Sequence, residues 1–457
     1  MVNDISRQQF PLPEDVLKLK CIGAYAQALE KIDYLVGLER TPSVLRERLE
    51  LERHVLEALK DDQYPYTFAE AEDIMRSSLS DYQDGELAHY RDIGAADWLF
   101  VDGEVRFNKR FFGNLASTRP EISDRLLVQD DIEETNRDQA LRDEQVRIMA
   151  EKGGRTARIT VHLGIKVKKE FERPGIPVLV HLPLPRECRQ ISDFEILGHG
   201  AGILSVADAD APQRTISFSC DLEPDQEFWV EYRYVNHVDH VAPDPAQVTK
   251  RQPGFFLEEQ APHIVFTPYL KALAQEIVGD ELNPLLKARK VYDFVTTHVM
   301  YSYVRRYDTI DDLSEYAAVN LKGDCGIQAL LFITLCRICG VPARWQAGLY
   351  VTPEEIGSHD WAEFHVEPYG WMFCDCSFVG GAWRKGKLER WNHYFGNLDV
   401  LRLPSCGAIQ TPFDPPKKHW RGDPIDNQRG EFEYADEGLG HNQLDFQHRV
   451  LSFEWLD

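Results

Sequence analysis

The stretch Gly323-Asp324-Cys325-Gly326-Ile327-Gln328-Ala329-Leu330-Leu331 predicts a helix that opens with a cysteine. Apolar residues continue through Ile338 with almost no charge, which predicts that the helix is mostly buried. Asp324 is a suitable N-cap, and Gly340 is typical of the residue that follows a helix. A helix N-terminus favours an anion, so this position favours a reactive thiolate at Cys325.

The next strong pattern is a strand that carries polar side chains on one face. The residues that alternate there are His359, Trp361, Glu363 and His365. A turn at Tyr369-Gly370 follows, and Asp375 ends the next strand. A hairpin at this turn would place Asp375 beside His359, where a carboxylate can fix the imidazole tautomer and stabilise the imidazolium. Cys325, His359 and Asp375 are therefore candidates for a nucleophile, a base and an orienting residue.

Together these pieces resemble the transglutaminase-like superfamily of papain-type cysteine enzymes, in a bacterial-type multidomain form. The matching motifs are Gly323-Asp324-Cys325, Gly340-Val341-Pro342-Ala343-Arg344, His359-Asp360-Trp361-Ala362-Glu363, and Gly370-Trp371 with Asp375. The resemblance covers about residues 285–380. It implies that Cys325 is the nucleophile, His359 the general base and Asp375 the orienting residue. The sequence departs from the family at Asp375-Cys376-Ser377, where many members have Asp-Pro-Thr.

The resemblance also implies a fold and a reaction. The expected fold is α+β, with a papain-like core of a helix packed on an antiparallel sheet. The expected reaction is acyl transfer or hydrolysis at an amide or peptide bond through a thioester, without a cofactor. Hydrolysis is favoured over cross-linking, because cross-linking needs a site for a second substrate. The alternative is a catalytically silent interaction scaffold with the same fold.

The residue that stabilises the oxyanion is less clear from the sequence. The backbone amide of Cys325 is a natural donor, and Tyr301 and Tyr303 are side-chain candidates. Trp361 and Glu363 are expected to shape the pocket or the core rather than take part in the chemistry.

Two clusters of metal-ligating residue types compete with this interpretation. Four thiols come from Cys336, Cys339, Cys374 and Cys376. Because the first two lie in an apolar helix rather than on a zinc knuckle, core packing is the better interpretation. The strand face with His359, Glu363 and His365 could also bind a metal, but no further ligand is evident. We therefore expect no metal. Cys325 itself could be a buried structural cysteine, which its His and Asp partners argue against.

Helical spacing dominates residues 1–152, for which we expect a helical accessory domain. Thr41 is expected as an N-cap before Pro42, and Thr67 with Glu70 predicts a capping box. Two further segments are expected, an extended stretch from Trp98 to Phe112 and a charged helix from Asn136 to Lys152.

Residues 153–245 change to the period of strands, which predicts an antiparallel β-sandwich. The alternating runs begin near Ala157, Val178, Ile216 and Phe228. A proline-containing linker leads to the catalytic core, expected over 255–415, and 416–457 is expected to be a C-terminal extension. The acidic stretch Asp423-Pro424-Ile425-Asp426-Asn427 does not have EF-hand spacing, so a turn is expected there.

Composition narrows the class of protein further. The 457 residues carry a formal charge of −24, which argues against nucleic acid or an anionic membrane as the main partner. Nine cysteines in so long a chain are not a disulfide scaffold. Met1 to Pro11 has no apolar core of a signal peptide, and no apolar run is long enough to span a membrane. We expect a cytoplasmic protein that acts on a peptide or protein amide.

Overall fold

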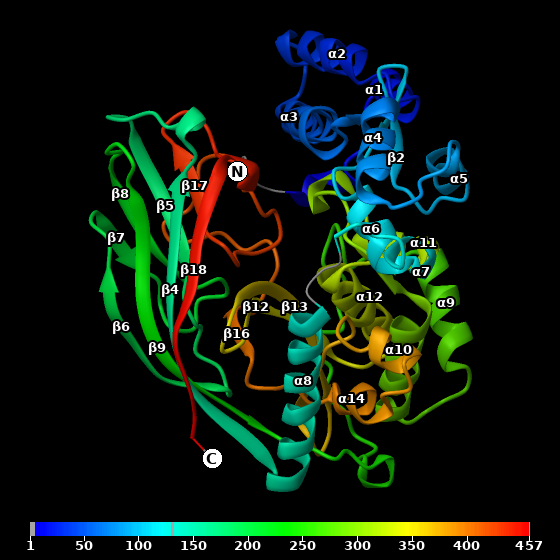
Figure 1. Cartoon of the computed structure of the whole chain (residues 1–457), viewed down its shortest axis with the longest axis vertical. Helices are drawn as coiled ribbons and strands as arrows, with labels where there is room; N and C mark the ends of the chain where they lie inside the picture. Colours follow the sequence, from blue (N-terminus) through cyan, green and yellow to red (C-terminus); the bar gives the residue numbers. More distant parts are fainter. Residues whose placement is uncertain (1–4, 129–131, 457) are drawn as a thin grey trace.

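The computed structural model describes residues 5–128 and 132–456. Residues 1–4 lie outside these described ranges. They belong to the segment from Met1 to Pro11, for which no signal peptide is expected. The chain combines helices with antiparallel sheets, which confirms the expected α+β class. Figure 1 shows three parts: a β-sandwich, an N-terminal helical part, and a core in which α12 (Cys325–Ile338) packs on a sheet.

The N-terminal part is mainly helical, as predicted. Its helices are η1 (Ile5–Gln9), α1 (Glu14–Cys21), α2 (Tyr25–Gly37), α3 (Ser43–Ala58), η2 (Leu59–Gln63), α4 (Phe68–Ser78), α5 (Glu86–Asp92), α6 (Phe111–Thr118) and α7 (Pro120–Ser123). The predicted extended stretch forms β2 (Trp98–Val101) and β3 (Glu104–Phe107), which pair with each other, and β1 (Tyr66–Thr67) pairs with β3. The predicted capping box of Thr67 and Glu70 is present at the start of α4.

The predicted N-cap role of Thr41 is wrong. Pro42 occupies the N-cap position of α3, without a side-chain cap. The hydroxyl of Thr41 instead donates to the carbonyl of Leu35, 2.5 Å away, near the end of α2. The side chain therefore closes the turn between the two helices, which competes with capping.

The β-sandwich consists of two four-stranded antiparallel sheets. One has the order β17-β5-β8-β7, from β17 (Glu431–Tyr434), β5 (Pro177–Pro183), β8 (Thr215–Asp221) and β7 (Ile203–Val206). The other has the order β18-β4-β9-β6, from β18 (Leu444–Trp455), β4 (Gly154–Val167), β9 (Glu227–Asp239) and β6 (Ile191–His199).

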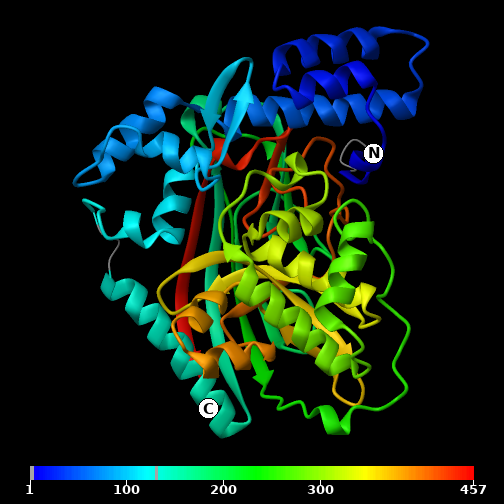
Figure 2. The same cartoon turned by 90° about the vertical axis from the view of Figure 1, so that its right-hand side faces the viewer.

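The segment 416–457, expected as a C-terminal extension, contributes strands to the sandwich. β17 pairs with β5 and β18 pairs with β4 along almost its whole length. Each sheet thus takes one strand from the C-terminal segment, and the chain returns to the sandwich after it has formed the core (Figure 2). In the sequence, the core is inserted between strands of the sandwich. The segment from β16 to β17 therefore connects the core with the sandwich.

The core is built around α12 on a five-stranded antiparallel sheet of order β15-β14-β13-β12-β16. Its strands are β12 (Ala343–Val351), β13 (Ile356–Val366), β14 (Gly370–Cys374), β15 (Phe395–Gly396) and β16 (Arg402–Cys406). Helices α9 (Pro268–Val278), α10 (Pro284–His298) and α11 (Leu313–Asn320) contact α12, and the core also contains α13 (Gly380–Arg384) and α14 (Leu388–His393). Two short strands, β10 (Met300–Tyr301) and β11 (Lys322–Gly323), pair just before α12. The remaining short helices are η3 (Lys169–Phe171), η4 (Pro245–Gln247), η5 (Tyr307–Thr309) and η6 (His441–Gln443).

The long helix α8 (Ile132–Lys152) lies between the sandwich and the core (Figure 1). It contacts β4 on the sandwich side and α14 on the core side. Within the described ranges, no helix combines the length and the apolar character needed to cross a membrane.

Candidate active site

The N-terminus of α12 is fixed by an aspartate and a tyrosine. Asp324 is the N-cap, as predicted, and its Oδ1 accepts from the backbone amide of Ile327 at 3.4 Å. The hydroxyl of Tyr307 donates to the same carboxylate oxygen. A Cβ on Gly326 would overlap the Tyr307 hydroxyl and Asp360 Oδ2, so only glycine allows these two groups to come this close to the helix.

Cys325 stands at the first position of this helix and is half-buried. Its thiol donates to Oδ2 of Asp360, with 3.3 Å between Sγ and Oδ2. Burial, followed by the carboxylates of Asp360 and Asp324, raises the pKa of Cys325 well above the value of an ordinary thiol. This shift of the thiol pKa is opposite to the lowering that we expected from the helix N-terminus, because burial and two carboxylates act against the helix dipole.

His359 and Asp375 form the pair that the hairpin pattern predicts. The strands β13 and β14 pair from Val366 opposite Gly370 to Ala362 opposite Cys374, and this register carries Asp375 to His359. His359 Nε2 lies 2.8 Å from Asp375 Oδ2, and both side chains are buried. Burial lowers the pKa of His359 in spite of Asp375, so the imidazole is neutral and its Nδ1 is left for another partner.

Arg402 completes this pair and was not recognised from the sequence. Its guanidinium is fully buried and lies 2.9 Å from Asp375 Oδ2 and 2.9 Å from Asp399 Oδ1. Burial alone would raise the pKa of Asp375, but His359 and Arg402 lower it below the usual carboxyl range. The orienting carboxylate is thus held ionised by a buried cation. No local pattern indicates this role, because Arg402 lies on β16, two strands away from His359 in the sheet.

The structure brings His359 and Asp375 together but pairs Cys325 with Asp360 instead. Asp360 follows His359 on β13, and neighbouring side chains of a strand point to opposite faces of the sheet. The carboxylate that holds the thiol therefore lies on the face opposite the imidazole.

The carboxylate of Asp360 is held by residues from outside the core helix and hairpin. The side-chain amide of Gln428 donates to Asp360 Oδ1 and also to Asp426 Oδ2, 3.3 Å away. The indole of Trp345 donates to the same oxygen of Asp426 at 3.2 Å. The stretch 423–427, expected only as a turn, thus reaches the neighbourhood of Cys325. Its acidic residues were visible in the sequence, but nothing in the sequence indicates what they contact.

Two aromatic rings enclose His359. The ring of Phe378 lies 4.5 Å from the imidazole and that of Tyr350 lies 6.4 Å from it, measured between centroids. Helix α8 covers these rings: Asp138 accepts from the Tyr350 hydroxyl at 2.7 Å, and the guanidinium of Arg142 lies 4.4 Å from the Phe378 ring. A helix that precedes the sandwich thus contributes to the surroundings of the base.

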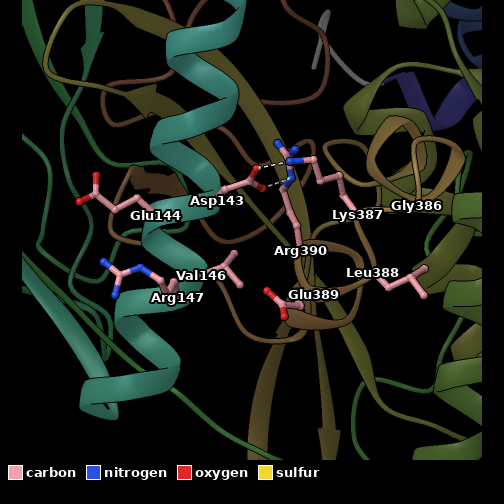
Figure 3. A pocket seen from close by; sticks show the side chains of 9 residues that line it. All are labelled: Asp143, Glu144, Val146, Arg147, Gly386, Lys387, Leu388, Glu389 and Arg390. Atoms are coloured by element: carbon pink, nitrogen blue, oxygen red, sulfur yellow. Dashed lines mark hydrogen bonds and ion pairs between the residues drawn. The ribbon is translucent and has the colours of Figure 1, made fainter.

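The same helix borders an open hollow of about 610 Å³ between it and the start of α14 (Figure 3). Asp143 of α8 makes ion pairs of 3.0 Å with Lys387 and with Arg390 at the start of α14. None of Cys325, His359 and Asp375 lines this hollow. We assign it to the junction between α8 and the core.

The other residues singled out in the sequence have structural contacts. Trp361 is fully buried and donates to Gln346 Oε1 at 2.7 Å. Glu363 pairs with Arg344 at 2.7 Å and with Arg189 at 3.4 Å. These contacts agree with the expectation that both residues shape the core.

The two candidate oxyanion tyrosines differ in position. Tyr301 is near enough to Cys325 for the thiol to contribute to its raised pKa, after burial. Tyr303 is 46% exposed and lies under the guanidinium of Arg110, 4.6 Å from its ring centre. Tyr307, which no sequence pattern indicated, donates its hydroxyl to Asp324, the N-cap of α12.

The cysteine cluster that was weighed as a zinc site has one short contact. Cys374 Sγ and Cys376 Sγ lie 3.7 Å apart and are both buried. In the part of the chain that the structure describes, no group of three or more His, Cys, Asp or Glu residues is arranged to hold a metal ion.

A comparison with known families matches the segment that carries these residues. Residues 271–376 match the family described as the transglutaminase-like superfamily, and this segment contains Cys325, His359 and Asp375. The matched segment, and not the whole chain, is the transglutaminase-like part of the protein.

Similar solved structures are distant. A candidate cysteine protease from Cytophaga hutchinsonii has 14% sequence identity and a TM-score of 0.42, covering 66% of this chain and 91% of that chain. The periplasmic domain of TgpA from Pseudomonas aeruginosa has 12% identity and a TM-score of 0.28, covering 55% of this chain and 96% of that chain. Similarity at this level carries no argument about activity. No curated protein matches the chain in sequence.

Proposed function

We propose that this protein is a cysteine-dependent enzyme that cleaves or transfers an acyl group at an amide or peptide bond. The observation that carries the proposal is the buried hydrogen bond between His359 and Asp375, in the segment that matches the superfamily and contains Cys325. A neutral imidazole fixed by an ionised carboxylate is the arrangement that a general base needs.

The reaction has two steps. The proton of the Cys325 thiol passes to His359, and Sγ attacks the carbonyl carbon of the substrate. The leaving amine takes that proton from His359 as the carbon–nitrogen bond breaks, which leaves a thioester on Cys325. Water or a second amine then attacks the thioester, releases the acid or a new amide, and restores the thiol. Asp375 stabilises the imidazolium between these transfers.

This sequence of events requires Cys325 Sγ to leave Asp360 Oδ2 and, because Asp360 and His359 point to opposite faces of β13, also requires the start of α12 or β13 itself to shift so that Sγ reaches the imidazole. The hydrogen bond of the thiol to Asp360 is the observation that favours the alternative, a catalytically silent scaffold. We favour the enzyme, because the base and its orienting carboxylate are assembled in a buried network that a scaffold would not need.

The test is turnover of glutamine, peptide and simple amide substrates by the purified protein, with release of amine and incorporation of an added amine measured separately. We expect amine release without incorporation, and a loss of at least about 10³-fold in Cys325→Ala. Cys336→Ala is the matched control, because this cysteine lies in the same helix and is buried. Full activity of Cys325→Ala would contradict the proposal, and turnover of no substrate would favour the scaffold.

We also propose that the protein acts in the cytoplasm. All nine cysteines are free thiols, although Cys374 and Cys376 lie close together, and a reducing compartment maintains such thiols. Fractionation of cells that express the full chain tests this, and recovery with an exported marker protein would contradict it.

A further inference from the structure

Carboxyl groups lie around both Cys325 and His359, but those around His359 are paired with the buried cation Arg402. Asp360 accepts from the thiol itself, and it is 6% exposed. Beyond Asp360 lie Gln428 and Asp426, which are also buried and come from the segment between the core and β17. The site of the nucleophile is therefore completed by residues that the superfamily match at 271–376 does not include.

We propose that Asp360 holds Cys325 as a protonated thiol, and that Gln428 and Asp426 fix Asp360 in the position where it does so. This inference rests on the proposed function of Cys325 as the nucleophile, and it concerns how the same site is controlled. Asp360 touches the reacting sulfur, whereas Gln428 acts through Asp360 and is a positioning residue.

The physical reason is the repulsion between two anions. If the thiol lost its proton beside an ionised Asp360, two negative charges would lie 3.3 Å apart in a buried site. With the proton on sulfur, the S–H group donates to the carboxylate and only one charge is present. The thiolate forms at lower cost when the S–H proton passes to His359 and the sulfur has moved away from Asp360.

The groups around this pair add burial or negative charge, so they disfavour a second negative charge at the pair. They are Asp324 from the start of α12, Tyr301 and Tyr307 from the segment before it, and Asp423 and Asp426 from the C-terminal segment. Burial raises the pKa of Asp360, and Asp426, Asp423 and Asp324 raise it further. Arg421 and His441 lower the pKa of Asp423 from the far side of that segment. His359 faces the opposite side of β13, with Asp375, Asp399 and Arg402.

Gln428 keeps the carboxylate in place. Its side-chain amide donates to the oxygen of Asp360 that does not face the thiol, which favours the ionised form of that carboxyl group. The amide also donates to Asp426, so it bridges the two carboxyl groups. Loss of this bridge should let the Asp360 side chain turn and weaken its hold on the thiol.

The experiment is the rate of alkylation of Cys325 by iodoacetamide from pH 6 to pH 10, in the full-length protein. Peptide mapping by mass spectrometry separates Cys325 from the other eight cysteines. In Asp360→Asn the shape of the side chain is kept and its charge is removed. We expect the apparent pKa of alkylation to fall by at least about one unit, which is about a tenfold gain in thiolate at a pH below both values. Gln428→Ala should shift it in the same direction by less.

Cys336→Ala is the control that should leave the Cys325 profile unchanged, and thermal unfolding verifies that each variant is folded. The inference would be overturned if the pH profile of Cys325 alkylation were the same in Asp360→Asn and Gln428→Ala as in the wild-type protein. It would also be overturned if Cys325 were not alkylated in any of these proteins. Slower alkylation in Asp360→Asn would also overturn it, because Asp360 would then be the acceptor of the thiol proton. Failure of the proposed function is seen separately, as substrate turnover that persists in Cys325→Ala.

Discussion

On one face of β13, His359 belongs to a network in which Arg402 compensates the charges of Asp375 and Asp399; on the other face, Cys325 lies among carboxyl groups. Both faces are buried, so the difference is one of charge balance. The balanced face keeps its carboxylate ionised and its imidazole oriented. The acidic face keeps its thiol protonated. In this structure the imidazole of the proposed base is therefore oriented by its carboxylate, whereas the thiol of the proposed nucleophile is hydrogen-bonded to Asp360 instead of to His359.

The largest effect is expected from Asp375→Asn, which removes the charge on the balanced face. The amide can present its N–H group to Nε2 and so favour the wrong imidazole tautomer. We expect a loss of about 10³–10⁴-fold in kcat, with a smaller change in KM. Substrate turnover measures it, with Asp445→Asn on the exposed surface of β18 as the control. A kcat within a few-fold of the wild-type value would show that His359 does not depend on this carboxylate.

Arg402→Met should come next, because it leaves two buried carboxylates without a cation. Breaking a buried ion pair from one side costs about 3–5 kcal/mol of unfolding free energy. Chemical denaturation measures the loss. Arg158→Met is the control, since Arg158 and its partner Glu454 are both more than one third exposed, and a change within about 0.5 kcal/mol is expected there. Equal losses in the two variants would remove the distinction between the buried network and a surface pair.

The contributions of the two faces to the free energy of unfolding should change with pH in opposite directions. The pKa of Asp375 is lowered in the folded protein, so its contribution to stability is present above about pH 4 and is lost as the pH falls further. Burial and Asp423 raise the pKa of Asp426, so protonation of Asp426 stabilises the protein as the pH falls towards about 4 from above. Denaturation at a series of pH values should show that Asp375→Asn flattens the acid limb.

Asp426→Asn should flatten the upper part of the same curve and leave the acid limb unchanged. Its amide keeps an oxygen that can accept from Trp345, so the fold around it is retained. If both variants changed the same limb, the contrast in charge balance between the faces would be wrong.

The smallest effect is expected from Tyr307→Phe, on the acidic face. It removes one hydrogen bond to Asp324 and leaves that carboxyl group with the backbone amide of Ile327. A buried hydrogen bond to a charged group contributes about 1.5–3 kcal/mol, so a loss near the lower end is expected from this half-buried tyrosine. Tyr34→Phe is the exposed control. No loss beyond that of the control would show that Tyr307 does not support the helix start.

The core was predictable from the sequence where local patterns determine it. Asp324 caps α12, Asn283 caps α10 before Pro284, and Gly340 follows α12 in a left-handed conformation, all as the capping patterns indicate. The hairpin that brings Asp375 to His359 was also predictable, because a short turn fixes which strands pair.

What the sequence could not provide are contacts between distant segments. β18 pairs with β4, which precedes it by more than 270 residues, and its alternation gives no indication of its partner. Asp360 was noted only as the residue between His359 and Trp361. Its role depends on Cys325, Gln428 and Asp426, which reach it from two different parts of the chain. The family resemblance indicated His359 as the partner of the thiol and gave no reason to expect Asp360.

The most direct measurement is the site of the covalent intermediate. The protein is mixed rapidly with a short-chain p-nitrophenyl ester, quenched in acid, and examined by mass spectrometry of the intact chain and its peptides. We predict one acyl group on Cys325, removable by hydroxylamine as a thioester is, and absent from Cys325→Ala. An acyl group on another of the nine cysteines, or release of p-nitrophenol by Cys325→Ala at the wild-type rate, would contradict the account.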